Sequence, residues 1–103
     1  VLRAANGKLY VGCNVENASY PLGNCAESSA IAVMVQKGGK RIDRIAVAGG
    51  KSEVSSCAPC GGCRQRIFEF ADANTIIITM GDNQDDWQHY TINELLPTGF
   101  RLD

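Results

Sequence analysis

The sequence predicts a single α/β domain in which helices cover a mixed, mostly parallel sheet. Two observations lead to this fold class. First, patterns typical of strands alternate with patterns typical of helices after an opening hairpin, which implies parallel pairing with an antiparallel edge. Second, 103 residues with 45% hydrophobic and 20% charged side chains suit one small folded domain. We therefore expect residues 1–103 to form one domain.

The chain is predicted to open with a hairpin made from residues 1–5 and 8–15. Both runs are rich in apolar residues, and Asn6-Gly7 joins them. Asn-Gly between such runs is a strong hairpin signal because both turn positions favour positive φ. A loop over residues 16–23 follows.

The first helix is predicted over residues 26–37. Asn24 is the expected N-cap, and Gly38 follows the last helical residue, as is common at helix ends. The side chains expected on its buried face are Ile31, Met34 and Val35.

The second half of the chain continues the alternation. We predict, in order, a strand over 41–48, a polar loop over 51–58, a helix over 59–71, a strand over 75–80, an acidic turn over 81–86, a strand over 87–91 and a short helix over 92–96. Pro59 can begin a helix because its missing N–H is not needed there. The β-branched run 75–80 is typical of a strand buried on both faces. Ile67, Phe68 and Phe70 should pack inward.

Charge and hydropathy exclude some classes of protein. Ten basic and eleven acidic residues are spread along the chain, so no basic run favours nucleic-acid binding or editing. The longest apolar stretches, residues 30–35 and 76–78, are too short to span a bilayer. The chain does not open with a secretory signal, so the expected compartment is the cytoplasm.

Five cysteines point to metal binding rather than to a disulfide scaffold, because the number is odd and three lie within seven residues. Cys60 and Cys63 have the spacing that aims two sulfurs at one metal, and Cys25 supplies a third. At helix N-termini, partial positive charge favours the thiolate form that binds zinc. Taken alone, Cys25 also fits a small buried hydrophobic residue.

Two cysteines are expected to stay outside this site. Cys57 and Cys60 also form a Cys-x-x-Cys pair, but Pro59 should leave Cys57 in the preceding loop. Cys13 is expected to pack within a strand.

Glu27 follows Cys25 by two residues, an offset that holds a carboxylate near the metal without making it an easy ligand. Such a carboxylate suits proton transfer. An alternative is a capping box, because Asn24 and Glu27 have nearly its spacing.

The two zinc stretches, CAE at 25–27 and PCGGCRQ at 59–65, match the signature of zinc-dependent nucleobase deaminases. NVENASYP at 14–21, and ELLP at 94–97 with Phe100, extend the match, and from about residue 12 to residue 100 the chain resembles cytidine deaminase. The resemblance implies a three-layer α/β sandwich and a homotetramer. It also implies hydrolytic deamination of cytidine and deoxycytidine in pyrimidine salvage, with release of ammonia.

The resemblance assigns roles to residues of the zinc site. Cys25, Cys60 and Cys63 would hold Zn²⁺. Glu27 would be the general acid/base that takes a proton from the activated water, delivers it to N3 of the ring and later protonates the leaving amine. Many members with a cysteine as first ligand have arginine after this glutamate, where this chain has Ser28. Arg64 then remains as the arginine that would bond the sulfurs, or it is an exposed helix arginine.

The resemblance also implies substrate contacts. Asn14 and Glu16 would bond the ribose 3′-hydroxyl and share one face of a strand, and Ala26 would lie at the substrate. Other residues match positions that reach a neighbouring subunit's ligand: Ala18, Tyr20 and Phe100. Without the resemblance, we would expect Asn14 and Glu16 to lie on the exposed face of an edge strand. Tyr20 and Phe100 could equally be aromatic residues of the core.

Two other functions remain open. Deaminases of other aminopyrimidine nucleosides, such as blasticidin S, carry the same Cys-Ala-Glu and Pro-Cys-Gly-x-Cys-Arg-Gln runs, so only residues 14–20 favour cytidine. A zinc-stabilised module without activity would close all four metal positions. The N-terminal helix of the family, and its Phe-x-Val-Gly segment, have no counterpart in these 103 residues.

Overall fold

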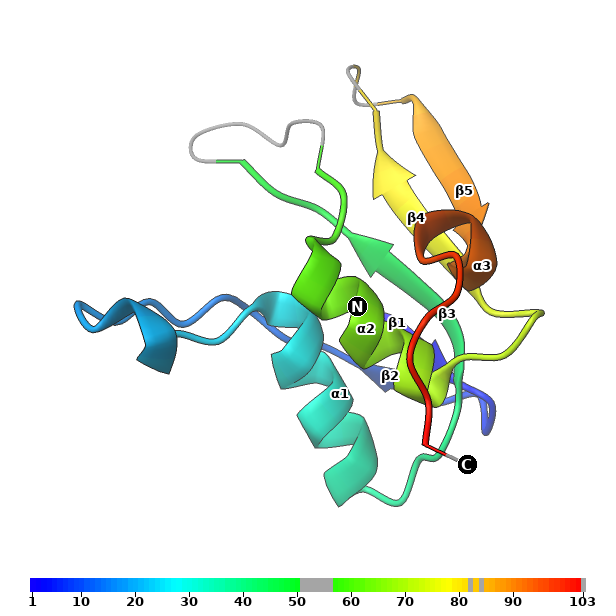
Figure 1. Ribbon diagram of the computed structural model, residues 1–103, viewed down its shortest axis with the longest axis horizontal. Coiled ribbons are helices and arrows are strands. Elements are labelled where there is room, and N and C mark those ends of the chain that lie inside the picture. Colours follow the sequence, from blue (N-terminus) through cyan, green and yellow to red (C-terminus); the bar gives the residue numbers. More distant parts are fainter. Residues whose placement is uncertain (51–56, 82, 84, 103) are drawn as a thin grey trace.

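The computed structural model describes residues 1–50, 57–81, 83 and 85–102. Its five strands form one sheet in the order β2-β1-β3-β4-β5, with α1 and α2 against one face (Figure 1). The elements are β1 Leu2–Ala4, β2 Leu9–Tyr10, the 3₁₀ helix η1 Tyr20–Leu22, α1 Ala26–Gln36, β3 Ile42–Val47, α2 Gly61–Phe70, β4 Ile76–Met80, β5 Trp87–Thr91 and α3 Ile92–Leu95. The α/β class and the order of elements are confirmed. Residues 51–56 of the predicted polar loop, and residues 82 and 84 of the acidic turn, lie outside the described residues.

The sheet is mixed, but the prediction that most of its pairings are parallel is wrong. Only β3 and β4 pair in parallel, and the other three neighbouring pairs are antiparallel. The connection through α1 leads from β2 to β3, and these two strands run in the same direction, as is usual for a helical crossover. They do not pair with each other, however, because β1 lies between them in the sheet.

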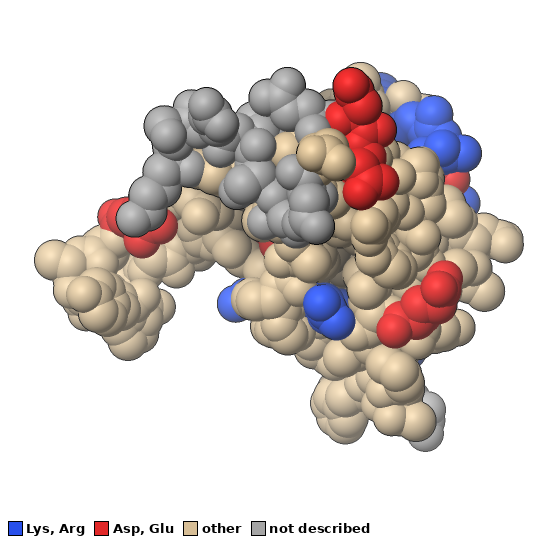
Figure 2. Space-filling model, turned by 90° about the horizontal axis from the view of Figure 1, so that it is seen from above, with Lys and Arg blue, Asp and Glu red and all other residues tan. Residues whose placement is uncertain are grey.

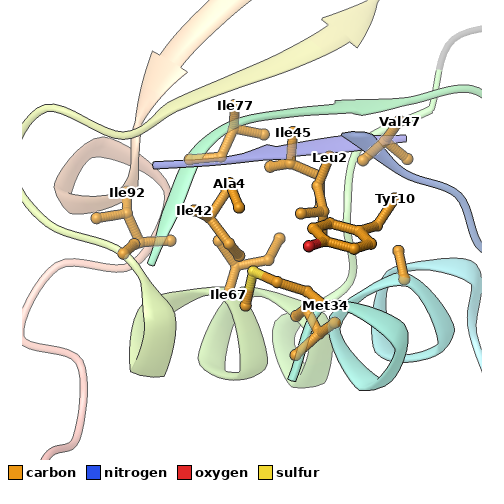
Figure 3. Close-up of a cluster of buried hydrophobic side chains, with 13 residues drawn as sticks. Leu2, Ala4, Tyr10, Met34, Ile42, Ile45, Val47, Ile67, Ile77 and Ile92 are labelled. Carbon is orange, nitrogen blue, oxygen red and sulfur yellow. The ribbon is translucent and has the colours of Figure 1, made fainter. Parts of the chain in front are cut away.

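The main core lies between the sheet and the two long helices (Figure 3). Ile45 and Ile77 enter it from the sheet, and Met34 and Ile67 meet them from the helices, each at most 2% exposed. Val35, predicted to be buried, is 48% exposed, because it lies about 100° around the helix from Met34. Residues that pack around this core with part of their surface exposed include Val33, Phe68 and Phe70.

The opposite face of the sheet is less covered. Ile77 of β4 is fully buried, whereas its neighbours Ile76 and Ile78 are only half-buried. The prediction that residues 75–80 are buried on both faces is therefore too strong. The described residues account for two layers, the sheet and one layer of helices.

α1 begins at Ala26 as predicted, although its N-cap is not the predicted residue, and α2 begins at Gly61, two residues after the predicted start. The N-cap of α1 is Cys25, because Asn24 is extended and pairs with Val15 through two backbone hydrogen bonds. The N-cap of α2 is Cys60, so Pro59 precedes the helix instead of opening it. At the other end of α1, Gly38 has the positive φ of +88° that a glycine stop requires.

Residues 11–24, called here the projecting segment, leave the sheet after Tyr10 and stand out from the body (Figure 1). The predicted strand over 8–15 is therefore wrong beyond its first residues. A Cβ at Gly12 would lie 2.4 Å from the Ala26 carbonyl oxygen, so the chain runs tightly past the first turn of α1. This course takes the segment away from the sheet edge.

The described part of the chain contains no helix that is long and apolar enough to cross a membrane. On the face shown in Figure 2, acidic and basic side chains lie in small separate groups among uncharged ones. This face agrees with the nearly balanced charge of the sequence.

Candidate metal centre

The N-termini of α1 and α2 bring together two cysteines that are 38 residues apart in the sequence. Cys25 precedes α1, Cys63 lies in the first turn of α2, and their sulfurs are 2.7 Å apart. The Glu27 carboxylate completes a group in which one ligand atom from each residue lies within 4.8 Å of the others. Three of the four residues predicted for this cluster therefore lie together at these helix ends.

The two sulfurs differ in electrostatics. Burial raises the pKa of the Cys25 thiol, but the hydrogen bond with the Cys63 thiol and the nearby polar groups of Ser28 outweigh it, so this pKa lies below its usual value. Burial raises the pKa of Cys63 far above its usual range, and the nearby Cys25 and Glu27 add to this effect. Without a cation, the thiolate therefore forms more readily at Cys25.

Cys60 occupies the N-cap of α2 and is exposed. Its pKa lies below the usual value, chiefly because of the nearby backbone N–H of Cys63, against a smaller opposing effect of burial. Contacts with the Cys63 side chain and the Gly62 N–H act in the same direction. Its sulfur lies outside the group of three ligand atoms, on the solvent side of the helix end.

The donor set fits a zinc ion. All five cysteines are free thiols, and two of them lie beside a carboxylate at adjoining helix N-termini. Sulfur is a preferred zinc ligand, and the partial positive charge of a helix N-terminus stabilises thiolate. The residues present therefore suit this metal.

The other two cysteines lie elsewhere. The sulfur of Cys57 packs against Gly49, and the Cys57 N–H donates to the carbonyl of Met80. Cys57 therefore contacts residues that do not belong to the cluster. Cys13 is exposed in the projecting segment, and the prediction that it packs in a strand is wrong.

A cavity of about 310 Å³ opens beside the cluster. Its walls include Ala26 and Glu27 from α1, residues 45–48 at the end of β3, and Trp87 from β5. This volume is at the lower end of the range for small-molecule sites. Glu27 thus belongs both to the cluster and to the cavity wall. No sequence pattern marks Trp87, because it reaches the cavity only through the order of strands.

Asn14 holds the start of α1. Its side-chain oxygen accepts from the Ala26 N–H at 2.8 Å, which satisfies one of the free donors of the first turn. Glu16 is exposed two residues further along. The prediction that Asn14 and Glu16 share a strand face is wrong, because neither belongs to a strand.

The residues expected to reach a neighbouring subunit are exposed. Ala18 lies in the projecting segment, Tyr20 is 89% exposed in η1, and the Phe100 side chain is 68% exposed. The backbone of Phe100 is fixed to α2 through two hydrogen bonds with the Gln65 side chain. None of these three side chains lines the cavity beside Glu27.

Two arginines on α2 have different partners. Arg64, the arginine singled out by the sequence, donates to the carbonyls of Pro59 at 2.8 Å and Leu95 at 3.0 Å. Arg66 instead donates to the sulfur of Cys63, at 3.8 Å. Sequence reasoning missed Arg66, although its position three residues after Cys63 puts both side chains on one helix face.

The capping box considered for Glu27 does not form, because the helix begins after Cys25 and this cap has no side-chain hydrogen bond. The Glu27 carboxylate therefore makes no capping hydrogen bond at this helix end. A capping box does form at α3, between Thr91 and Glu94.

Comparison with known proteins identifies the family. The model of the cytidine and deoxycytidylate deaminase zinc-binding region matches residues 1–80. A cytidine deaminase of Mycoplasma genitalium is 40% identical over 97 residues, which span 94% of this chain and 73% of that protein. A cytidine deaminase of Halalkalibacterium halodurans is 40% identical over 98 residues, 95% of this chain and 72% of that protein.

Solved structures agree. The crystal structure of cytidine deaminase from Burkholderia pseudomallei superposes with a TM-score of 0.83 at 37% identity, covering 96% of this chain and 77% of that chain. That of cytidine deaminase from Mycobacterium tuberculosis gives a TM-score of 0.74 at 33% identity, covering 98% of this chain and 76% of that chain. By sequence and by fold, this chain belongs to the zinc-binding cytidine and deoxycytidylate deaminase family.

Proposed function

We propose that this protein hydrolyses cytidine and deoxycytidine to uridine and deoxyuridine, with release of ammonia. The observation that carries the proposal is the double position of Glu27, next to two sulfurs and in the wall of a cavity. Its carboxylate can therefore meet both a metal and a small molecule in that cavity. Membership of a deaminase family supports the choice of reaction.

The proposed zinc ligands are Cys25, Cys60 and Cys63. Cys25 and Cys63 already lie in contact, and Cys60 begins the same helix turn as Cys63. A side-chain rotation of the exposed Cys60 would bring in the third sulfur. When bound, the zinc supplies a Lewis acid that lowers the pKa of water to about 7.

Glu27 is the proposed proton carrier. Its carboxylate accepts one proton from the attacking water and gives it to N3 of the pyrimidine, where the proton stays. It then moves the second proton of that water, from the hydroxyl formed at C4, to the leaving amine. The overall reaction adds one water and releases one ammonia. Residues 45–48 and Trp87 form other walls of the same cavity, where they can enclose the ring and exclude water.

The sugar side of the substrate is assigned to the projecting segment. Asn14 lies next to Ala26 at the start of α1, so its remaining amide N–H groups lie near the cavity wall and can donate to a ribose hydroxyl. Glu16 can accept from the same sugar. The apolar exposure of Tyr20 and Phe100 suits burial against another copy of the chain, which supports a homotetramer.

The proposed setting is pyrimidine salvage in the cytoplasm. Five free thiols, three of them assigned here to zinc, suit a reducing compartment.

The decisive assay is ammonia release from cytidine by the zinc-loaded complete gene product, with blasticidin S as the rival substrate. We expect rapid turnover of cytidine. Much faster turnover of blasticidin S would show that the assignment of cytidine as substrate is wrong. A zinc-loaded protein that is inactive on both substrates would instead favour a zinc-stabilised module without activity.

A further inference from the structure

Arg66 folds back along α2 toward the cluster. Its Nη1 lies 3.8 Å from the Cys63 sulfur, within hydrogen-bonding distance of this large acceptor. Side chains in a helix point toward its N-terminus, so a residue three positions after Cys63 is placed to make this contact. The guanidinium therefore reaches a sulfur although Arg66 itself is exposed.

Gly62 leaves the space that this guanidinium uses. A Cβ at Gly62 would lie 3.2 Å from Arg66 Nη1 and 4.0 Å from the Cys60 sulfur. The guanidinium and the second α2 sulfur thus both border the open side of the same glycine.

The sulfurs of the cluster have different neighbours. The Cys25 sulfur lies 2.7 Å from that of Cys63, and the Ser28 hydroxyl donates to the Cys25 carbonyl and not to its sulfur. Among the hydrogen bonds of the described residues, the one from Arg66 is the only contact between a positively charged side chain and these sulfurs. Arg64 is directed to other partners, since its Nε and Nη1 donate to the backbone carbonyls of Pro59 and Leu95.

The charge of the cluster gives this contact a physical role. Three thiolates exceed the charge of one Zn²⁺, and the Glu27 carboxylate adds to the excess. Cys63 is fully buried, and a buried charge is costly unless a partner compensates it. A guanidinium at its sulfur offsets that charge and draws electron density away from the thiolate, which leaves the metal a stronger Lewis acid.

We propose that Arg66 is a positioning residue of the metal centre, which balances the charge of the Cys63 thiolate by direct donation from α2. This inference rests on the zinc ligands proposed above. It gives α2 two tasks, because the helix then supplies both sulfur ligands and the positive charge that offsets them.

The test compares Arg66→Ala with Arg44→Ala, a matched control that removes one exposed positive charge from β3. Zinc loss to a chelator should be about 10-fold faster in Arg66→Ala, the usual size of an effect from a partner of a metal ligand. In the Co²⁺-substituted protein, its thiolate-to-metal charge-transfer band should move to lower energy. Arg44→Ala should match the wild type in both measurements.

Arg66→Lys tests whether a positive donor is what matters. Lysine keeps the charge, so this variant should retain zinc better than Arg66→Ala and move the band less. If Arg66→Ala holds zinc as the wild type does and leaves the cobalt band unmoved, the inference is overturned while the proposed function stands. Equal losses in the lysine and alanine variants would also overturn it. A wild type without zinc would overturn both proposals.

Discussion

The N-termini of α1 and α2 meet at one place and start alike, yet they contribute different chemistry. Each helix begins after a cysteine with an extended backbone and no side-chain cap. The first turn of α1 then carries Glu27 and Ser28, whereas that of α2 carries two glycines and Cys63. We infer that α1 supplies the proton carrier, and that α2 supplies most of the sulfur and its compensating charge.

The two ends are also anchored differently. The projecting segment holds the start of α1 through two hydrogen bonds, from the Ala26 N–H to the Asn14 side chain and from the Ser29 hydroxyl to the Cys13 carbonyl. Arg64 ties α2 to the end of α3 and to Pro59, next to Cys60. The α2 end is therefore fixed by the body of the domain, and the α1 end by an exposed segment.

The largest expected effect comes from the α2 sulfurs. Cys63→Ser and Cys60→Ser should each abolish zinc retention and activity, measured by metal analysis and ammonia release. Only Cys63→Ser should also destabilise the zinc-free protein, by about 1–3 kcal/mol, because it puts a hydroxyl in a fully buried site. Full zinc and activity in Cys60→Ser would remove Cys60 from the ligand set.

Glu27→Gln tests the α1 side. It should lower kcat by about 10²–10⁴-fold, the usual contribution of a proton-transfer group. Zinc content should stay that of the wild type, since glutamine changes the proton carrier and none of the proposed sulfur ligands. Glu69→Gln, an exposed change on α2, is the control and should keep full activity. Loss of zinc in Glu27→Gln would instead make Glu27 a ligand.

Asn14 variants test the anchor of α1. Asn14→Ala removes the acceptor for the Ala26 N–H, which should cost about 1 kcal/mol and lower Tm by about 4–8 °C. Asn14→Asp keeps the acceptor, so its Tm should stay near that of the wild type. Because it loses the amide donor, its KM for cytidine should rise. An unchanged KM in Asn14→Asp would contradict the proposed sugar contact.

The smallest effect should come from a pair remote from both helix ends. Arg3 donates to Asp43 across β1 and β3, and this hydrogen bond lowers the pKa of the carboxyl below its usual value. A lowered folded-state pKa stabilises the protein above the unfolded pKa, and this gain disappears as pH falls through the folded pKa. Asp43→Asn should therefore lower Tm slightly at neutral pH, and the two curves should converge in acid. A constant difference at all pH values would contradict this.

Local patterns predicted most elements correctly. The run of β-branched residues in β4 and the glycines after α1 were sufficient to place these elements. The prediction of a strand over 8–15 was wrong because it rested on apolar residues, whereas the course of the chain past Gly12 is set by its close contact with α1. The prediction that Val35 is buried was wrong because apolar character alone does not tell which side of a helix faces the core.

The site shows the same division. Cys25, Glu27 and Cys63 were identified by spacing and resemblance, and they lie together. The sequence motif points to Arg64, adjacent to Cys63, and not to Arg66, whereas helix geometry favours the arginine three positions after Cys63. Trp87 lies far from the motifs in sequence and enters the cavity through the pairing of β5 with β4.

The order of helices and strands and the residue types of a zinc site can be predicted from the amino acids alone, because these depend on periodicity and spacing within short stretches. The folded arrangement is needed to know which arginine reaches a sulfur, which strands pair in parallel and what lines the cavity beside Glu27. Those features depend on contacts between segments that are far apart in the chain, which no local pattern encodes.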